Sequence, residues 1–173
     1  LYLIANALML ADDYGTPVVY SGYAFSDRDA GAPQDADGRV TGWTCAGVTG
    51  PRDEYADGEG VCTEAWTAIA GLLELRRVAA DAPRLPGIGD GDVYGFEREG
   101  RALLLVNPST ADAAATVPVG LPDGDYCDVI SGGAGAVTSG GCAGATVTVT
   151  GGNVTADVPA EGAVALHIGA RLS

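Results

Sequence analysis

The sequence predicts part of an α/β fold followed by an all-β domain. Near the N-terminus the pattern reads helix, turn and buried strand, which is the order of elements in an α/β barrel or a doubly wound sheet. From Asp92 onward apolar residues recur at every second position and no helical stripe returns, which is typical of antiparallel strands in a sandwich or barrel. A Pro- and Gly-rich stretch, residues 83–91, separates the two parts and marks a domain boundary.

The first expected element is a helix. Residues 1–11 contain the helix formers Ala, Leu and Met, have no Gly or Pro, and are apolar almost all round. We therefore expect the tail of a buried helix. Leu1 is neither an initiator Met nor the start of an export signal, so we also expect the chain to continue a longer protein.

A strand and a long loop follow. Gly15 and Pro17 predict a turn, and the dense run of β-formers from Val18 predicts a strand covered on both faces. Residues 26–62 are polar and show scarcely any apolar periodicity. A loop of that length in a compact protein is usually functional or disordered.

The carboxyl end of this strand carries candidate ligand residues, because α/β folds place their sites at that edge. An aromatic ring and a run of charges there suit a site for a sugar or another polar ligand. These residues are Phe25, Asp27, Arg28 and Asp29. The alternative is a solvated rim in which the charges pair with one another, and exposed pairs of that kind signify little.

A second helix is expected over residues 63–81. Thr63 is a suitable cap, apolar residues recur at spacings of three and four, and Arg76 and Arg77 complement the dipole of the last turns. After the linker we expect strands over residues 93–98, 102–107, 114–118, 125–130, 145–150, 154–158 and 163–168.

The charge balance excludes two classes of partner. Nine basic residues stand against 23 acidic ones, which gives a net charge of −14. Nucleic acids and anionic membranes would repel such a chain. No apolar run approaches the roughly 20 residues that a membrane span requires.

The four cysteines predict disulfides. Cys45 lies near Cys62 and Cys127 near Cys142, but four cysteines allow three connectivities and the sequence alone does not choose. A zinc site is the alternative. It is disfavoured because there is no C-x-x-C spacing and the single histidine, His167, lies in an alternating strand pattern. Disulfides favour an oxidising, extracellular location.

Four stretches together resemble a known family. They are Tyr-Gly-Thr-Pro-Val-Val-Tyr-Ser-Gly-Tyr-Ala-Phe over residues 14–25, Gly-Ala-Pro at 31–33 with Asp-Gly at 37–38, Cys62 ahead of Glu-Ala-Trp, and Gly-Leu-Pro-Asp-Gly-Asp-Tyr-Cys-Asp-Val-Ile-Ser-Gly over residues 120–132. In this order they resemble the C-terminal third of secreted α-amylases of glycoside hydrolase family 13. The similarity is to the animal type that also occurs in actinobacteria.

The resemblance implies a fold and a disulfide pairing. Residues 1–82 would be the end of a catalytic (β/α)8 barrel, with residues 18–23 as its eighth strand, and residues 86–173 would be a Greek-key β-sandwich domain. The family pattern pairs Cys45 with Cys62 and Cys127 with Cys142.

The resemblance also implies a reaction, which is retaining hydrolysis of internal α-1,4-glucosidic bonds of starch or glycogen. That chemistry needs a carboxylate nucleophile and a second carboxyl group as acid and base. In the family these groups lie upstream of the part resembled here, so we expect no catalytic residue and no activity in this chain alone. The rim candidates for the α-glucan are Tyr23, Phe25, Asp27, Arg28 and Asp29.

Cofactors and partners follow from the same resemblance. The parent enzyme is expected to need calcium, although no residue of this chain matches a metal ligand. Members that bind chloride carry a basic residue where this chain has Val18, and an aliphatic group cannot balance a buried anion, so chloride is not expected. We expect a secreted monomer. The alternative is a non-catalytic β-domain that binds starch or caps the barrel. Tyr94, Phe96 and Tyr126 alternate with apolar neighbours, which favours the core over a sugar platform.

Overall fold

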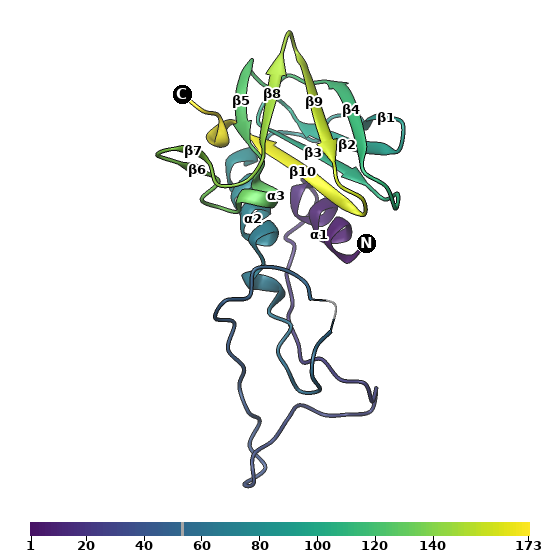
Figure 1. Cartoon of the computed structure of the whole chain (residues 1–173), viewed down its shortest axis with the longest axis vertical. Coiled ribbons are helices and arrows are strands. Elements are labelled where there is room, and N and C mark those ends of the chain that lie inside the picture. The colour runs from purple at the N-terminus through teal and green to yellow at the C-terminus, as the bar shows by residue number, and fades with distance from the viewer. Residues whose placement is uncertain (53) are drawn as a thin grey trace. The chain divides into compact units, whose positions relative to one another are not determined.

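The computed structural model describes residues 1–52 and 54–173. Asp53, inside the predicted loop of residues 26–62, lies outside the described residues. The chain divides into two compact units, Leu1–Pro17 with Thr67–Ser173, and Val18–Trp66. Nearly all helices and strands belong to the first unit, whereas the second is mainly irregular backbone (Figure 1).

The first unit contains two four-stranded antiparallel sheets (Figure 1). One sheet has the order β1-β2-β3-β10, with strands Ile88–Asp90, Val93–Arg98, Ala102–Asn107 and Gly162–His167. The other has the order β4-β9-β8-β5, with strands Ala113–Pro118, Asn153–Val158, Thr146–Thr150 and Gly124–Cys127. A small ribbon pairs β6 (Val137–Thr138) with β7 (Gly141–Cys142). The predicted antiparallel β-domain is therefore confirmed.

Side chains from both sheets share one core. In β9 every second residue is buried, as expected for a strand with one face toward the core and one toward solvent. β3 is buried along its whole length, because the helices cover its other face. The core comprises Val93, Leu103, Leu105, Ala115, Val117, Val119, Leu121, Tyr126, Val147, Val149, Val154, Ala156, Val158, Val164 and Leu166.

Two helices pack beside this sandwich. α1 (Tyr2–Ala11) and α2 (Thr67–Ala79) contact each other, and both contact β3 and β10 (Figure 1). The helix predicted over residues 1–11 is confirmed, but not its burial all round. Ile4, Ala7 and Leu10 are buried, whereas Tyr2 and Met9 are exposed, so one side of α1 packs on its neighbours.

The buried strand predicted from Val18 is wrong for this structure. Residues 18–22 form no strand, and Val18 and Tyr20 are 77% and 78% exposed. A strand persists only where a neighbour satisfies its backbone groups, and the described residues offer this segment just a bridge between Tyr23 and Gly60 and flanking loop bonds. Every strand pair in the described part of the chain is antiparallel, so these residues build no parallel barrel sheet.

Several strands differ from expectation by one residue at an end, and three differences are larger. The second helix begins with a separate 3-10 turn, Thr63–Ala65, and α2 starts only after Trp66, which has extended backbone. The strand expected over residues 125–130 ends at Cys127, because Asp128 caps the short helix α3 (Val129–Gly132). The linker over residues 83–91 contains β1, which adds to the edge of the first sheet. A 3-10 turn, Ile168–Ala170, follows β10.

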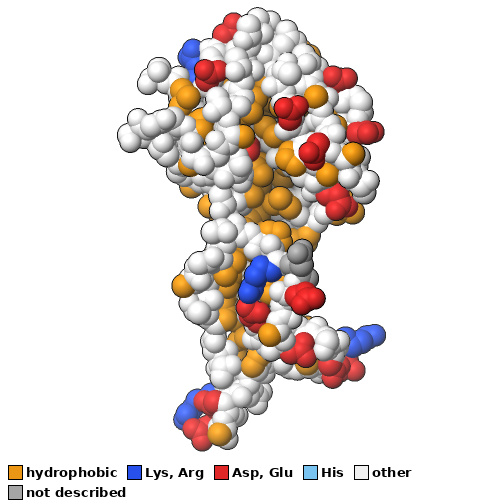
Figure 2. Space-filling view, viewed as in Figure 1, with side chains coloured by type: hydrophobic (Ala, Val, Ile, Leu, Met, Phe, Trp, Pro, Cys, Tyr) orange, Lys and Arg blue, Asp and Glu red, His pale blue; other side chains and the backbone are white. Residues whose placement is uncertain are grey.

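Charged side chains are spread over the surface. On the face in Figure 2, Asp and Glu side chains are scattered, and Arg side chains form no basic patch. Among the described helices, none has the length and hydropathy that crossing a membrane requires.

Candidate functional site

The second unit is organised by pairing between two of its segments. The amide of Ala24 donates to the carbonyl of Glu59 at 2.8 Å, and the amide of Gly58 donates back to the carbonyl of Ala24 at 2.7 Å. One step further along, the amide of Val61 donates to the carbonyl of Gly22 at 3.0 Å. This short ladder holds residues 57–61 against residues 22–26, which carry two of the predicted rim candidates.

The side chain of Tyr23 is held by a hydrogen bond and by a ring contact. Its hydroxyl donates to the carbonyl oxygen of Thr41 at 2.5 Å. The ring packs edge-to-face on Trp43, with 4.5 Å between ring centroids and 86° between planes. Aromatic pairs favour this geometry, which brings the positive ring edge to the negative ring face. These two contacts fix the orientation of the Tyr23 side chain.

A pocket of about 220 Å³ opens beside Tyr23. Phe25, which is 49% exposed, lines it together with Asp57 from the paired segment. The carboxylate of Asp57 accepts from the amide of Ser26 at 2.7 Å and from its hydroxyl at 2.9 Å. The full lining is Tyr23, Ala24, Phe25, Ala30, Gly31, Pro33, Asp57 and Gly58.

Sequence reasoning missed Asp57. It lies in the long polar loop, next to Gly58, among many other acidic residues. Only the register between residues 22–26 and 57–61 brings it to Phe25, and this register leaves no trace in the pattern of apolar residues.

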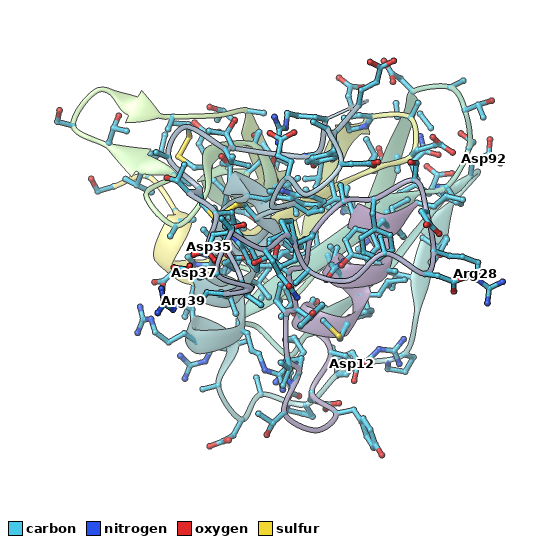
Figure 3. All side chains as sticks on the ribbon, turned by 90° about the horizontal axis from the view of Figure 1, so that it is seen from below. Asp12, Arg28, Asp35, Asp37, Arg39 and Asp92 are labelled. Atoms are coloured by element: carbon cyan, nitrogen blue, oxygen red, sulfur yellow. A yellow bond between two sulfur atoms is a disulfide. The ribbon has the colours of Figure 1, made fainter. Side chains whose placement is uncertain are left out.

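The three charged rim candidates lie outside the pocket lining. Asp27 turns the backbone, since its carboxylate accepts from the amide of Asp29 at 2.9 Å. Arg28 and Asp29 are 3.9 Å apart, and their side chains are 94% and 88% exposed. Arg28 extends away from the chain (Figure 3). The structure thus brings Tyr23 and Phe25 to one pocket and leaves these charges as a solvated rim.

A second group of contacts holds the distal loop. The guanidinium of Arg52 contacts the carboxylate of Glu59 at 2.6 Å and lies 4.5 Å from the ring centre of Tyr55. The amide of Ala56, and then the guanidinium of Arg52, lower the pKa of Glu59. Glu59 is therefore ionised at neutral pH and helps to hold the segment that carries Asp57.

Both disulfides form in the pairs that the resemblance implies. Cys45 bonds Cys62 in the second unit, and Cys127 bonds Cys142 beside the β-sandwich. Glu64 lies near the first bridge, and these three residues are the sole group with metal-like spacing in the described part of the chain. Disulfide sulfurs are not the thiolates that bind metals, so this group does not fit a metal.

Comparison with known protein families assigns the β-sandwich to a family of domains. The profile of the family described as "Alpha amylase, C-terminal all-beta domain" matches residues 89–169. This chain carries an alpha-amylase C-terminal all-beta domain. The similarity extends beyond the domain. The chain is 34% identical to an alpha-amylase of Hypothenemus hampei over 99% of its own length, and 36% identical to one of Thermomonospora curvata over 96%.

Solved alpha-amylase structures agree. The alpha-amylase I of Eisenia fetida superposes with a TM-score of 0.76 at 29% identity, over 96% of this chain and 35% of that enzyme. A mutant of the same enzyme, solved as a complex with maltohexaose, superposes with a TM-score of 0.68 at 32% identity, over 96% of this chain and 35% of that one. The chain spans 34% of the Hypothenemus enzyme and 26% of the Thermomonospora enzyme.

Within the alpha-amylase domain, the aromatic residues are mostly structural. Phe96 and Tyr126 are buried, and the hydroxyl of Tyr126 donates to the carbonyl of Pro122 at 2.7 Å. Tyr94 is the exception, with 45% of its surface exposed. A second pocket of about 350 Å³ lies along Leu85, Pro86, Gly87, Ile88, Glu97, Pro118, Val119 and Gly120. Its carboxylate, on Glu97, is already held by the amides of Gly100 and Gly120.

Proposed function

We propose that this chain is the C-terminal part of a secreted α-amylase that hydrolyses internal α-1,4-glucosidic bonds of starch or glycogen with retention. The observation that carries the proposal is similarity to alpha-amylases along nearly the whole chain, not only over the β-domain. Two disulfides support a location outside the reducing cytoplasm.

In this proposal residues 1–82 belong to the catalytic barrel and residues 86–173 form the β-domain. A barrel strand at residues 18–23 would then form only against neighbouring strands from elsewhere in the protein, which fits the exposure of Val18 and Tyr20. The packing of α1 and α2 on β3 and β10 supports a role for the β-domain as a cap on barrel helices.

The division of labour follows from the reaction. Retaining hydrolysis requires two carboxyl groups about 5–5.5 Å apart across the scissile bond. The pocket at Phe25 offers one carboxylate, Asp57, which already accepts two hydrogen bonds from Ser26. We therefore assign the chemistry, and the calcium expected for the parent enzyme, to residues outside this chain. Tyr23 and Phe25 contact the α-glucan.

The test is the activity of the gene product with and without the sequence encoded upstream of Leu1. This chain alone should release no reducing ends from starch. The longer product should cleave starch internally and release products in the α-configuration, read by NMR at the anomeric proton. Cleavage by the chain alone, or β-configured products from the longer protein, would contradict the proposal.

Chloride gives a second test of the same proposal. The side chain at position 18 is aliphatic, so the rate of the longer protein should be unchanged by chloride. A Val18→Arg variant is the matched comparison, because it restores the basic group of chloride-dependent members. Activation of the unaltered protein by chloride would argue against this assignment.

The alternative of a starch-binding module is tested at Tyr94, the exposed aromatic residue of the sandwich. In co-sedimentation with raw starch, a Tyr94→Ala variant of the chain should behave as the unaltered chain does if the β-domain caps the barrel. Loss of binding in that variant would favour a starch-binding module.

A further inference from the structure

We infer that the pocket lined by Phe25 and Asp57 binds a single glucosyl residue, with Phe25 as the stacking surface and Asp57 as the hydrogen-bond acceptor. The class of ligand rests on the proposed function. The pocket itself rests on the contacts within Val18–Trp66.

The size of the pocket suits one sugar ring. Sites for drug-sized ligands usually measure about 300–1,000 Å³. A volume of about 220 Å³ lies below that range, so an oligosaccharide would place one residue inside and the rest outside. The pocket borders open space at Gly31, because a Cβ added there would meet no atom of the described residues within 4 Å. The chain of an α-glucan has room to leave at that side.

The pocket lining is partly apolar and partly polar, as are the surfaces of a pyranose ring. The apolar part of the lining comprises Phe25, Ala24, Ala30 and Pro33. A sugar ring has an apolar C–H face that packs on such a surface, and about half of the surface of Phe25 is exposed for such a contact. Gly58 allows the paired segment to pack closely on Pro33, since a Cβ there would lie 2.7 Å from Cγ of Pro33.

The polar side accepts hydrogen bonds. A carboxylate has about four lone-pair sites on two oxygens, and Ser26 occupies one on each oxygen of Asp57. Asp57 is exposed, so its remaining sites can accept from the hydroxyl groups of a sugar in place of water. The carboxylate also repels anions, so phosphorylated sugars are disfavoured.

The pocket is assembled before a ligand arrives. The amide of Ser26 orients Asp57, the ladder to Ala24 holds Gly58, and the disulfide Cys45–Cys62 closes the loop that carries both. A ligand therefore need not order these groups on binding, which lowers the entropic cost of association.

The experiment is an NMR titration of the intact chain with maltotriose, read by saturation transfer to the sugar. We expect saturation concentrated on one of its three rings and a Kd on the order of 1 mM, as suits a ligand of this size in a small site. The Phe25→Ala variant should bind at least tenfold more weakly. The Asp57→Asn variant, which can still bond Ser26, should bind several-fold more weakly.

The matched control is Tyr20→Ala. Tyr20 is an exposed aromatic residue of the same segment that does not line the pocket, so its variant should bind maltotriose as the unaltered chain does. Equal loss in both aromatic variants, or no saturation of maltotriose by the unaltered chain, would overturn the inference. Starch cleavage by the longer gene product is a separate readout, so the proposed function can hold or fail independently of this pocket.

Discussion

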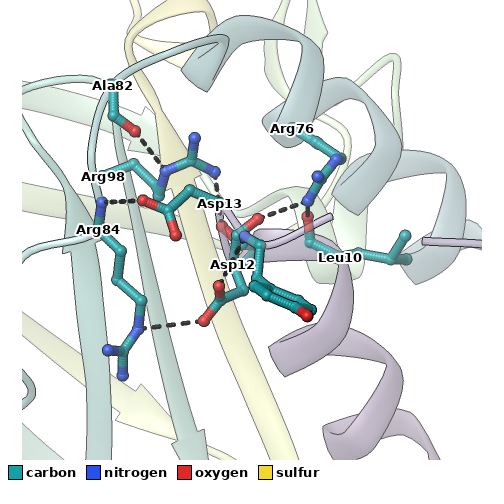
Figure 4. A network of polar contacts seen from close by, with 9 residues as sticks. Leu10, Asp12, Asp13, Arg76, Ala82, Arg84 and Arg98 are labelled. Atoms are coloured by element: carbon teal, nitrogen blue, oxygen red, sulfur yellow. Dashed lines mark hydrogen bonds and ion pairs between the residues drawn. The ribbon is translucent and has the colours of Figure 1, made fainter. Parts of the chain in front are cut away.

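The guanidinium of Arg98 donates through Nη1 to the carbonyl oxygen of Ala11, 87 residues earlier in the chain, at 2.9 Å. The same side chain donates to the carbonyls of Ala80 and Ala82 at 2.8 and 2.7 Å. These carbonyls lie at the C-terminal end of α1 and just past α2, where backbone carbonyls have no partner within a helix. One residue of β2 thus ties both helices to the sheet (Figure 4).

Carboxylates complete this network. The amide of Arg84 donates to Asp13 at 2.8 Å, and its guanidinium lies 3.3 Å from Asp12 (Figure 4). The amide of Arg84 holds the pKa of Asp13 below its usual range. Burial lowers the pKa of Arg98, although at neutral pH it remains charged. The helices and the sandwich should therefore unfold together.

Replacing Arg98 tests this connection. The Arg98→Ala variant leaves three buried or partly buried carbonyls without donors, so we expect the free energy of unfolding to fall by about 3 kcal/mol. The matched control is Arg101→Ala, an exposed arginine three residues on, which should change it by less than about 0.5 kcal/mol. Urea unfolding followed by circular dichroism measures both. Equal stability of the two variants would contradict the network's role.

Replacing Gly71 by Ala should change the free energy of unfolding through two opposing effects. Gly to Ala inside a helix usually stabilises by about 1 kcal/mol. A Cβ at Gly71, however, would lie 1.9 Å from the carbonyl oxygen of Val129, which belongs to α3 and cannot move aside as a side chain can. Overpacking costs about 1–3 kcal/mol, and a clash with rigid backbone belongs to the upper part of that range, so we expect Gly71→Ala to lower the free energy of unfolding by about 1–2 kcal/mol net.

The control for this change is Gly135→Ala. A Cβ at Gly135 would meet no atom within 4 Å in the described part of the chain, so the melting temperature of this variant should stay close to that of the unaltered chain. If Gly71→Ala melted at or above the unaltered chain, the packing of α2 on α3 would be looser than the structure has it.

The stability of the folded chain should depend on pH through His167. It is buried in β10, its Nδ1 has no hydrogen-bond partner among the residues that the structure describes, and Glu74 and Arg77 of α2 are the charged groups of those residues that act on it. Burial lowers its pKa, against a smaller opposite effect of Glu74. The unfolded chain therefore binds a proton at higher pH than the folded chain, so stability is full above about pH 6.5 and is lost as the pH falls toward the folded pKa.

The measurement is the free energy of unfolding in urea between pH 8 and pH 5. A His167→Gln variant lacks the titrating group, so its curve should be flatter over this window than that of the unaltered chain. Carboxylates with lowered pKa, such as Asp13 and Asp123, act only at lower pH and do not interfere. Parallel curves for the two proteins would exclude His167 as the source.

The parts of the fold that the sequence predicted well are those that depend on local pattern. β2 and β3 have the predicted bounds, and β9 differs by one residue, because the alternation of each strand records which face it buries. The helix at residues 1–11 was predicted for the same local reason.

The misses depend on contacts between distant segments. A strand at Val18 requires a partner strand, and the apolar run alone cannot supply it. An arginine in a strand is usually exposed. Arg98 is buried instead, and only the position of the two helix ends that it contacts explains this. Asp57 became a site residue through its register with Ser26, and that register is invisible in one segment read alone.

Asp128 explains why the segment over residues 125–130 changes from strand to helix. Its carboxylate accepts from the amides of Ile130 and Ser131 at 3.1 and 3.0 Å, and from the amide of Ala165 in β10 at 2.9 Å. The hydroxyl of Ser131 donates to it as well, at 2.6 Å. One buried side chain thus caps α3 and anchors it to the first sheet.

The Asp128→Ala variant would leave three backbone amides without this acceptor, so we expect it to lower the free energy of unfolding by about 3–4 kcal/mol. Asp128→Asn should lower the free energy of unfolding by less than Asp128→Ala, because one side-chain oxygen remains to accept. It should still destabilise the chain, because the new amide group faces a donor. Asp157→Ala, an exposed aspartate of β9, is the matched control and should change little. Thermal melts rank the three variants. If the two Asp128 variants melted together with Asp157→Ala, α3 would be held by packing on α2 instead of by its cap.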